Sequence, residues 1–264
     1  MKKLYFFAVV MTLSSQTLAN TDDIKQHITT GYEYTDYTED RGHKDVRFIE
    51  YGRKKGKTAI VTKVASINRD FNQGESAIGI QGGLDVSYDW NKFLSTKSGA
   101  TFSDHNPTLA RSEYRHDFYL KPIKNFVVNL GGKHATYDND IEVDALSYGL
   151  SWYSKRLILS YKYTGFDASD KPKTHGNTVS VKVKDQTGLG STQLWVGSGK
   201  GAYGYEWDNI DTMYTNDIDS IAIRREQPIT NNLLVGVTLG KTRYNIPSQD
   251  YDAVKGQLDF IYKW

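Results

Sequence analysis

The chain has 264 residues, of which 38% are hydrophobic, and its mean hydropathy is −0.57. This composition excludes a bundle of membrane-spanning helices, because each such helix needs about 20 consecutive apolar residues. The 19 tyrosines and 23 glycines are typical of strands and tight turns. The absence of cysteine excludes disulfides and cysteine-ligated metals, and the near balance of 33 basic and 31 acidic residues excludes a strongly basic nucleic-acid binder.

The first residues have the pattern of a secretory signal peptide. Lys2 and Lys3 give a positive start, Leu4–Leu13 form a short apolar stretch, and Thr17–Ala19 form a small-residue cleavage site. The alternative is an N-terminal membrane anchor, but this apolar stretch is too short to cross a bilayer. We therefore predict that residues 1–19 are a signal peptide that is removed after export.

Alternation of apolar and polar residues runs along the rest of the chain and indicates strands. In the clearest segment, Ile78, Leu84 and Trp90 fall on one face, while Gln81 and Asp85 fall on the other. Successive side chains of a strand point to opposite faces, so this segment has one apolar and one polar face. The pattern predicts about fourteen strands, with twelve as the alternative, each near the 9–11 residues that a tilted strand needs to cross a bilayer. In chain order these strands cover residues 26–36, 45–54, 58–70, 78–90, 92–103, 110–120, 125–137, 146–152, 157–164, 179–184, 191–206, 216–226, 233–240 and 254–264.

The connections between these segments predict an up-and-down meander. All five prolines fall between the predicted strands, where a missing N–H costs nothing: Pro107, Pro122, Pro172, Pro228 and Pro247. Short turns alternate with longer, more polar loops, among them residues 38–44, 104–109 and 165–175. No composition break divides the chain, so we predict one domain over residues 20–264.

The apolar face of such a sheet meets either a protein core or lipid, and three features favour lipid. Many full charges lie on the predicted polar face, which suits a lumen: Asp85, Arg111, Glu113, Arg115, Asp117, Lys162, Lys182, Arg224, Lys255 and Asp259, with Glu33 as a further member. Tryptophans at strand ends suit an interfacial girdle: Trp90, Trp152, Trp195 and Trp264 at the short-turn side, and Trp207 on the other. The apolar faces carry single aliphatic residues without the dense clusters of a soluble core. We therefore predict an all-β, antiparallel, up-and-down transmembrane β-barrel, because closing the sheet removes edges that lipid could not hydrogen-bond.

Several segments resemble the YaiO family of outer-membrane β-barrels: Gly31–Tyr37, Ile141–Ala145, Leu159–Tyr163, Asp167–Asp170, Ser191–Trp195 and Gly201–Trp207. They follow the family's order and spacing over nearly all of the exported chain. The resemblance implies a barrel in the cell outer membrane. It implies no catalytic residue, cofactor or ligand.

Two glycine-rich segments resemble phosphate-binding loops, but their context argues against that role. Gly236–Thr242 has three residues between its glycines where a phosphate-binding loop has four, and it lies in an alternating strand. Gly197–Gly204 has no strand-to-helix context. We expect neither segment to bind a nucleotide.

The histidines argue against a metal or catalytic site. They are dispersed along the chain without a close pair that could hold a metal: His27, His43, His105, His116, His134 and His175. Ser103, Asp104 and His105 are the best candidates for a hydrolase, yet adjacent residues of a strand point to opposite faces. We predict no catalytic residue, no cofactor and no metal.

Two residue sets leave alternatives open. Arg111, Glu113, Arg115 and Asp117 share one strand face about 7 Å apart, so they either pair and brace the wall or face water and act as a selectivity surface. Aromatic residues at the end of the strand predicted over 191–206 and in the loop after it either stack on sugars at the outer mouth or belong to a girdle and a solvated loop: Tyr203, Tyr205, Trp207 and Tyr214.

The functional hypothesis is a monomeric passive pore for polar solutes or saccharides. One alternative is a barrel enzyme that acts on lipid. The other is a non-conducting structural or surface-recognition barrel, for example an accessory to polysaccharide export. The expected partners are the lipid bilayer, a polar solute or saccharide, and the assembly machinery, which would read the C-terminal strand ending at Trp264. No nucleic acid is expected.

Overall fold

The computed structural model describes residues 25–72, 76–104, 109–137, 141–169, 172–200, 217–245 and 249–264. The predicted signal peptide lies outside these ranges. No helix long and apolar enough to cross a membrane is found in them.

The described ranges contain fourteen antiparallel strands in chain order. They are β1 (Lys25–Tyr37), β2 (His43–Lys55), β3 (Thr58–Asp70), β4 (Ser76–Asp89), β5 (Leu94–Ser103), β6 (Ser112–Leu120), β7 (Phe126–Thr136), β8 (Glu142–Tyr153), β9 (Leu157–Ala168), β10 (Thr174–Lys184), β11 (Ser191–Lys200), β12 (Asp217–Pro228), β13 (Leu233–Asn245) and β14 (Tyr251–Lys263).

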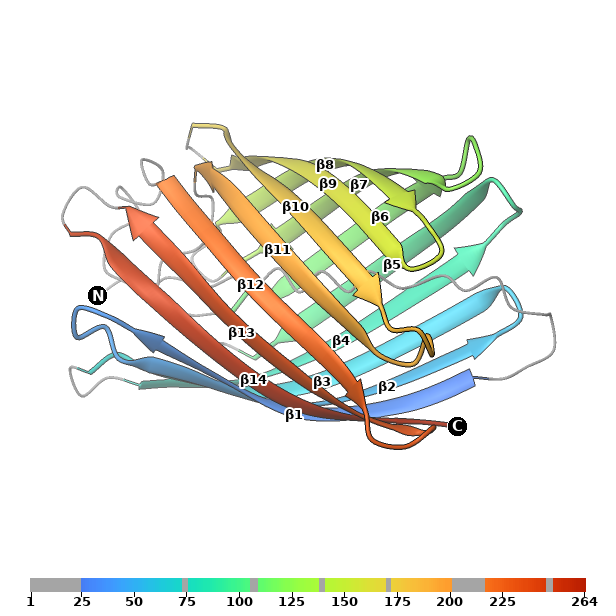
Figure 1. Ribbon diagram of the computed structural model, residues 1–264. Helices are drawn as coiled ribbons and strands as arrows, with labels where there is room; N and C mark the ends of the chain where they lie inside the picture. The colour runs from blue at the N-terminus through green and yellow to red at the C-terminus, as the bar shows by residue number, and fades with distance from the viewer. Residues whose placement is uncertain are drawn as a thin grey trace.

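These strands form a closed barrel, in which each strand pairs with its neighbours in the chain and β1 pairs with β14 (Figure 1). At the closure, the Gln26 N–H donates to the Trp264 carbonyl at 2.9 Å, and the Trp264 N–H donates to the Gln26 carbonyl at 3.0 Å. A complete ring of ladders leaves no sheet edge unpaired, which is what a hydrocarbon environment requires. The predicted up-and-down barrel of about fourteen strands is confirmed.

The two ends of the barrel differ in their connections, as the sequence pattern predicts. At one end the turns are tight. Between β2 and β3, for example, Lys55 pairs with Thr58 around Gly56, whose φ of 55° suits a residue without Cβ. At the other end the connections are longer, as between Ser103 and Ser112. We call these the short-turn end and the long-loop end.

The outer face of the barrel is apolar. Ile78 on β4, Leu146 on β8 and Leu239 on β13 are 70%, 61% and 59% exposed, and each belongs to an alternating row of large hydrophobic side chains. Such rows are the lipid-facing half of a transmembrane strand, whose other half faces the lumen. The polar residues of the same strands therefore define the interior.

Candidate functional site in the barrel interior

The interior face is identified by contacts between strands that are not neighbours. Arg115 on β6 reaches across β5 to Asp85 on β4, and its Nη2 donates to both carboxylate oxygens at 2.5 Å. Side chains of alternate strands converge only on the concave side of a curved sheet. Gly99 of β5 lies between them, and a Cβ on Gly99 would overlap the Asp85 carboxylate. The ion pair thus occupies the space that a glycine leaves open.

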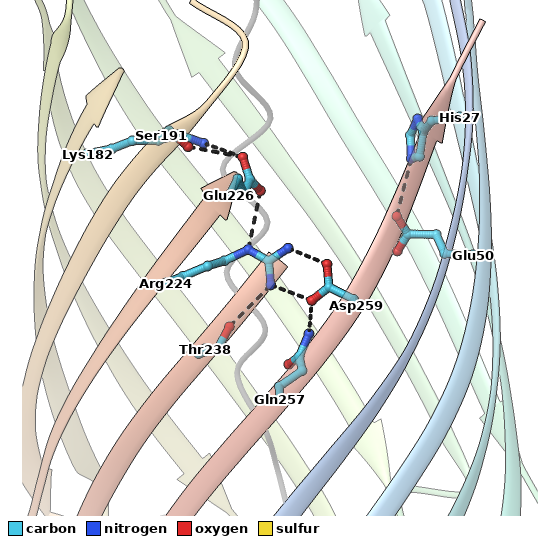
Figure 2. Close-up of polar contacts among 9 residues, drawn as sticks. All are labelled: His27, Glu50, Lys182, Ser191, Arg224, Glu226, Thr238, Gln257 and Asp259. Carbon is cyan, nitrogen blue, oxygen red and sulfur yellow. Dashed lines mark hydrogen bonds and ion pairs between the residues drawn. The ribbon is translucent and has the colours of Figure 1, made fainter. Parts of the chain in front are cut away.

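A second ion pair repeats this arrangement across β13. Arg224 on β12 donates from Nη1 and Nη2 to the two carboxylate oxygens of Asp259 on β14, both at 2.7 Å (Figure 2). Gly236 of β13 lies between them, and a Cβ there would overlap both the Asp259 carboxylate and the Arg224 guanidinium. The Asp259 carboxylate is fully buried. The cluster therefore holds a buried carboxylate in a bidentate contact, the strongest geometry available to it.

Further partners make this second cluster electrically neutral. Arg224 Nε also donates to Glu226 Oε1 at 3.2 Å, and Lys182 Nζ lies 3.9 Å from Glu226 Oε2. Figure 2 shows these side chains as one connected network with Ser191, Thr238 and Gln257. Two cations face two carboxylates, so the network presents polar atoms without a net charge.

The remaining predicted lumen charges pair between strands. Glu113 on β6 lies 3.6 Å from Lys133 on β7, and Asp117 accepts a hydrogen bond from Asn129 Nδ2 at 3.2 Å. Lys255 on β14 lies 3.4 Å from Glu33 on β1. The bracing of β6 therefore comes from its neighbour β7 and, across β5, from β4. Of the two options left open by the sequence, these contacts correspond to charges that pair and brace the wall, with partners that lie on other strands.

Two predicted lumen residues differ from the others. Arg111 precedes β6 and is exposed, and only its carbonyl takes part in the ladder, accepting from the Ser103 N–H at 3.2 Å. Lys162 on β9 is opposite Gly149 and Thr178 on the interior face. In the part of the chain that the structure describes, no hydrogen bond or ion pair joins the Lys162 side chain to another residue. Lys162 is therefore the candidate with a charge directed to the lumen rather than to a partner.

Sequence reasoning missed several members of the interior network. Lys97 lies 3.4 Å from Asp85 and Lys133 pairs with Glu113, but both belong to strands with weak alternation. Glu226 shares its strand face with Arg224, and that spacing of two would have identified it. Lys63 on β3, with Nζ 4.3 Å from the centre of the Phe48 ring, gave no sequence signal.

The predicted tryptophan girdle is only partly found. Trp90 packs edge-on against Tyr88 at 4.8 Å and Trp264 stacks on Tyr262 at 5.6 Å, both at the short-turn end. Trp152 shares the outer face of β8 with Leu150. Trp207 lies outside the described residues.

Trp195 requires a correction. It shares its face of β11 with buried Gln193, whereas Leu194 and Val196 on the opposite face are exposed. Trp195 thus lies on the interior face. Position near a strand end suits a girdle, but the alternation of side chains along β11 decides the face, and it places Trp195 with Gln193.

Leu109 and Ala110, at the end of the connection between β5 and β6, lie inside the barrel. Leu109, only 6% exposed, packs against Ala65 and Ile67 on the interior of β3. Ala110 joins a separate apolar cluster that includes Tyr37 of β1 and Ala135 of β7. Leu109 and Ala110 are apolar, and the lumen wall beside them offers apolar contacts that solvent does not. These two residues, which we call the inward segment, therefore occupy part of the interior near the long-loop end.

Two of the candidate hydrolase residues form hydrogen bonds with backbone groups at the ends of this connection. Asp104 Oδ2 accepts the Ile80 N–H at 3.0 Å, and Ser103 Oγ donates to the Ala110 carbonyl at 2.7 Å. His105 lies outside the described residues, as do Tyr203, Tyr205 and Tyr214. Among the residues that are described, no group of three His, Asp or Glu could hold a metal.

Comparison with known proteins identifies the family. The model of the YaiO membrane beta barrel domain matches residues 25–206, which is more than half of the chain. The chain belongs to the YaiO family. Because this family is one of outer-membrane barrels and the structural relatives include outer-membrane porins, the protein is located in the outer membrane.

Solved structures share the fold of this YaiO barrel at low sequence identity. The CymD monoaromatic hydrocarbon channel matches with a TM-score of 0.64 and 7% identity, over 93% of this chain and 89% of that chain. A bacterial polysaccharide outer membrane secretin matches with a TM-score of 0.56 and 12% identity, over 93% of this chain and 100% of that chain. An anion-selective porin from Comamonas acidovorans matches with a TM-score of 0.51 and 8% identity, over 92% and 99%. The YaiO barrel therefore resembles porins and channels in fold.

The glycine beneath the Arg224–Asp259 pair yields a testable prediction for the YaiO barrel. Gly236→Ala is expected to lower the free energy of unfolding by about 1–3 kcal/mol, because its Cβ would displace the ion pair above it. Gly256→Ala is the matched control, since a Cβ on Gly256 meets nothing within 4 Å. Denaturant titration of the refolded barrel in lipid vesicles measures both. Equal stability of the two variants would contradict the close fit.

Proposed function

We propose that this YaiO barrel is a passive, narrow outer-membrane pore for small polar solutes, saccharides among them. The observation that carries the proposal is the interior wall, where ion pairs and hydroxyl groups line a closed ring of fourteen strands. Eight strands leave room only for their own side chains, and sixteen to eighteen leave an aqueous channel. Fourteen strands lie between these limits.

The inward segment supports a narrow pore. Leu109 and Ala110 occupy part of the lumen near the long-loop end, against walls formed by β3 and by the apolar cluster around Ala135. A solute would pass between this segment and the polar wall. The pore would therefore select by size first and by local polarity second.

The similar structures support passage rather than catalysis. Two are named as a monoaromatic hydrocarbon channel and an anion-selective porin. A passive pore also agrees with the engagement of Asp104 and Ser103 in backbone contacts, which leaves them no obvious place in a hydrolytic site. The partners in this proposal are the bilayer around a monomer, the transported solute, and an assembly machinery that reads β14 and Trp264.

One observation favours a second candidate, a barrel accessory to polysaccharide export. The polysaccharide secretin is matched over its whole length with a TM-score of 0.56. Its name includes a polysaccharide and secretion, so by this likeness the barrel would assist export of a saccharide and not its uptake. Deletion of the gene would then change surface polysaccharide without changing the uptake of small solutes, whereas the passive pore predicts the reverse.

The pore is tested through Lys162, an interior lysine whose side chain forms no hydrogen bond or ion pair within the described residues. Lys162→Glu is expected to shift the reversal potential in a KCl gradient toward cation selectivity, because it changes the lumen charge by two. Lys241→Glu is the matched control, since Lys241 lies on the outer face of β13 and pairs with Asp252 at 2.7 Å. Planar-bilayer recording measures both. A purified barrel that never conducts would overturn the proposal.

A further inference from the structure

Trp195 is the one tryptophan among the described residues that lies on the interior face. Its register neighbours are Ser180 on β10 and Ala222 on β12, and Gly197 follows on the same face of β11. The side chains directly opposite the indole in both ladders are thus small. This arrangement leaves the ring partly accessible from the lumen, as its intermediate exposure shows.

Two buried hydrogen-bond donors on this wall lack partners within the described residues. The Trp195 indole nitrogen Nε1 and the Gln193 amide nitrogen Nε2 are both buried without a hydrogen bond. Gln193 is 6% exposed and lies two residues from Trp195 on the same face, so the two Cα atoms are about 7 Å apart. Buried donors are normally satisfied in folded proteins, and an unsatisfied pair at one place indicates a missing acceptor.

The charges around these donors indicate a neutral acceptor. Gln193 is paired in register with Lys182 and Arg224, which would attract an anion if they were free. Both cations are engaged by Glu226, and Arg224 also by Asp259. The two cations and two carboxylates next to Gln193 therefore balance, so an anion gains little from them. The unsatisfied donors also disfavour a purely apolar ligand, which would leave them buried without partners.

We propose that Trp195 and Gln193 form a binding site for a neutral oligosaccharide on the lumen wall. The C–H face of a sugar ring would lie on the indole, and sugar hydroxyl oxygens would accept from Trp195 Nε1 and Gln193 Nε2. The Ser180 hydroxyl, opposite Trp195, offers a further polar contact. This inference rests on the proposed pore only in that the sugar must reach the lumen.

Intrinsic tryptophan fluorescence of the folded barrel in detergent, titrated with maltohexaose, tests the site. The expected result is a saturable change that Trp195→Phe abolishes, since the reporting indole is then absent. Trp152→Phe, which removes an outward-facing indole, should retain the response. Gln193→Leu keeps the shape but removes the donor, so the apparent affinity for maltohexaose should fall about tenfold. Circular dichroism confirms that each variant is folded.

Three outcomes would overturn the site. These are no response of the folded native barrel to maltohexaose, a saturable response that persists in Trp195→Phe, or an equal response to benzoate and sulfate. The measurement does not require conduction, so failure of the pore and failure of the site are distinguishable. A barrel that conducts but does not respond has the pore without the site, and one that responds but does not conduct has the site without the pore.

Discussion

Replacing Arg224 with methionine is expected to lower the free energy of unfolding by about 3–5 kcal/mol. The substitution keeps much of the side-chain volume but leaves the Asp259 carboxylate, which has no exposed surface, without its bidentate partner. Glu226 loses its contact with Arg224 as well, and keeps those with Ser191 and Lys182. The network, which was neutral, then holds two carboxylates and one cation, Lys182.

The neighbouring residue Arg225 provides the control. It also forms a bidentate pair, with Asp185, and both distances are again 2.7 Å. That pair lies at the exposed short-turn end, where solvent screens the interaction. The Arg225 guanidinium nevertheless lowers the pKa of the Asp185 carboxyl through its hydrogen bonds, so the pair stays ionised at neutral pH.

Reversible unfolding by guanidinium chloride in lipid vesicles compares Arg224→Met with Arg225→Met. The expected order is a large loss for the first variant and a small one for the second. A double variant, Arg224→Met with Asp259→Leu, should recover part of the loss, because removing both partners leaves no unpaired charge. Equal losses for the two single variants would show that burial of Asp259 does not govern the stability of this wall.

Replacing Leu109 with asparagine is expected to release the inward segment and to increase the single-channel conductance. Full burial of a leucine side chain is worth about 1.5–3 kcal/mol, so the ratio of docked to released segment should fall about 10- to 150-fold. The substitution removes the apolar packing of Leu109 against Ala65 and Ile67 on β3. The barrel itself should remain folded, because its strand ladders do not include Leu109.

Planar-bilayer recording gives the conductance and its fluctuation for this variant. The chain contains no cysteine, so a disulfide between Leu109→Cys and Ile67→Cys can lock the segment inward. The locked barrel should conduct like the native one when oxidised and should fluctuate more when reduced. If Leu109→Asn left conductance and noise unchanged, the segment would not narrow the pore.

For the lumen residues, the sequence predicts the face of the strand on which a side chain lies but not the residue that it pairs with. The alternation in residues 78–90 places Asp85 on the polar face of its strand. The same alternation in β12 places Arg224 on the polar face of that strand. Their partners could not be predicted, because Arg115 reaches Asp85 across an intervening strand. Such a contact depends on curvature and on the register of two ladders, neither of which is local in the sequence.

Two strand glycines also show the difference between what the sequence predicts and what only the structure reveals. Gly99 and Gly236 are visible in the sequence as small residues within strands, where they weaken the strand if nothing compensates. Only the assembled wall shows that each lies beneath an ion pair that a Cβ would displace. Trp195 is the opposite case, because the apolar residues Leu194 and Val196 on either side of it indicate in the sequence itself that Trp195 lies on the other face.

By itself, the sequence determined the strands, their approximate number, the up-and-down order, the two unequal ends and the family. The strands, their number, their order and the unequal ends follow from alternation and turn residues, which act between near neighbours, whereas the family follows from the resemblance of particular segments such as Gly31–Tyr37. The tertiary structure alone decided which cation meets which carboxylate, that Lys162 has no ion pair among the described residues, and that Leu109 turns inward. These contacts depend on how a closed, tilted sheet brings distant strands together. Closure curves the sheet, and side chains from strands that are not adjacent then meet on its concave side.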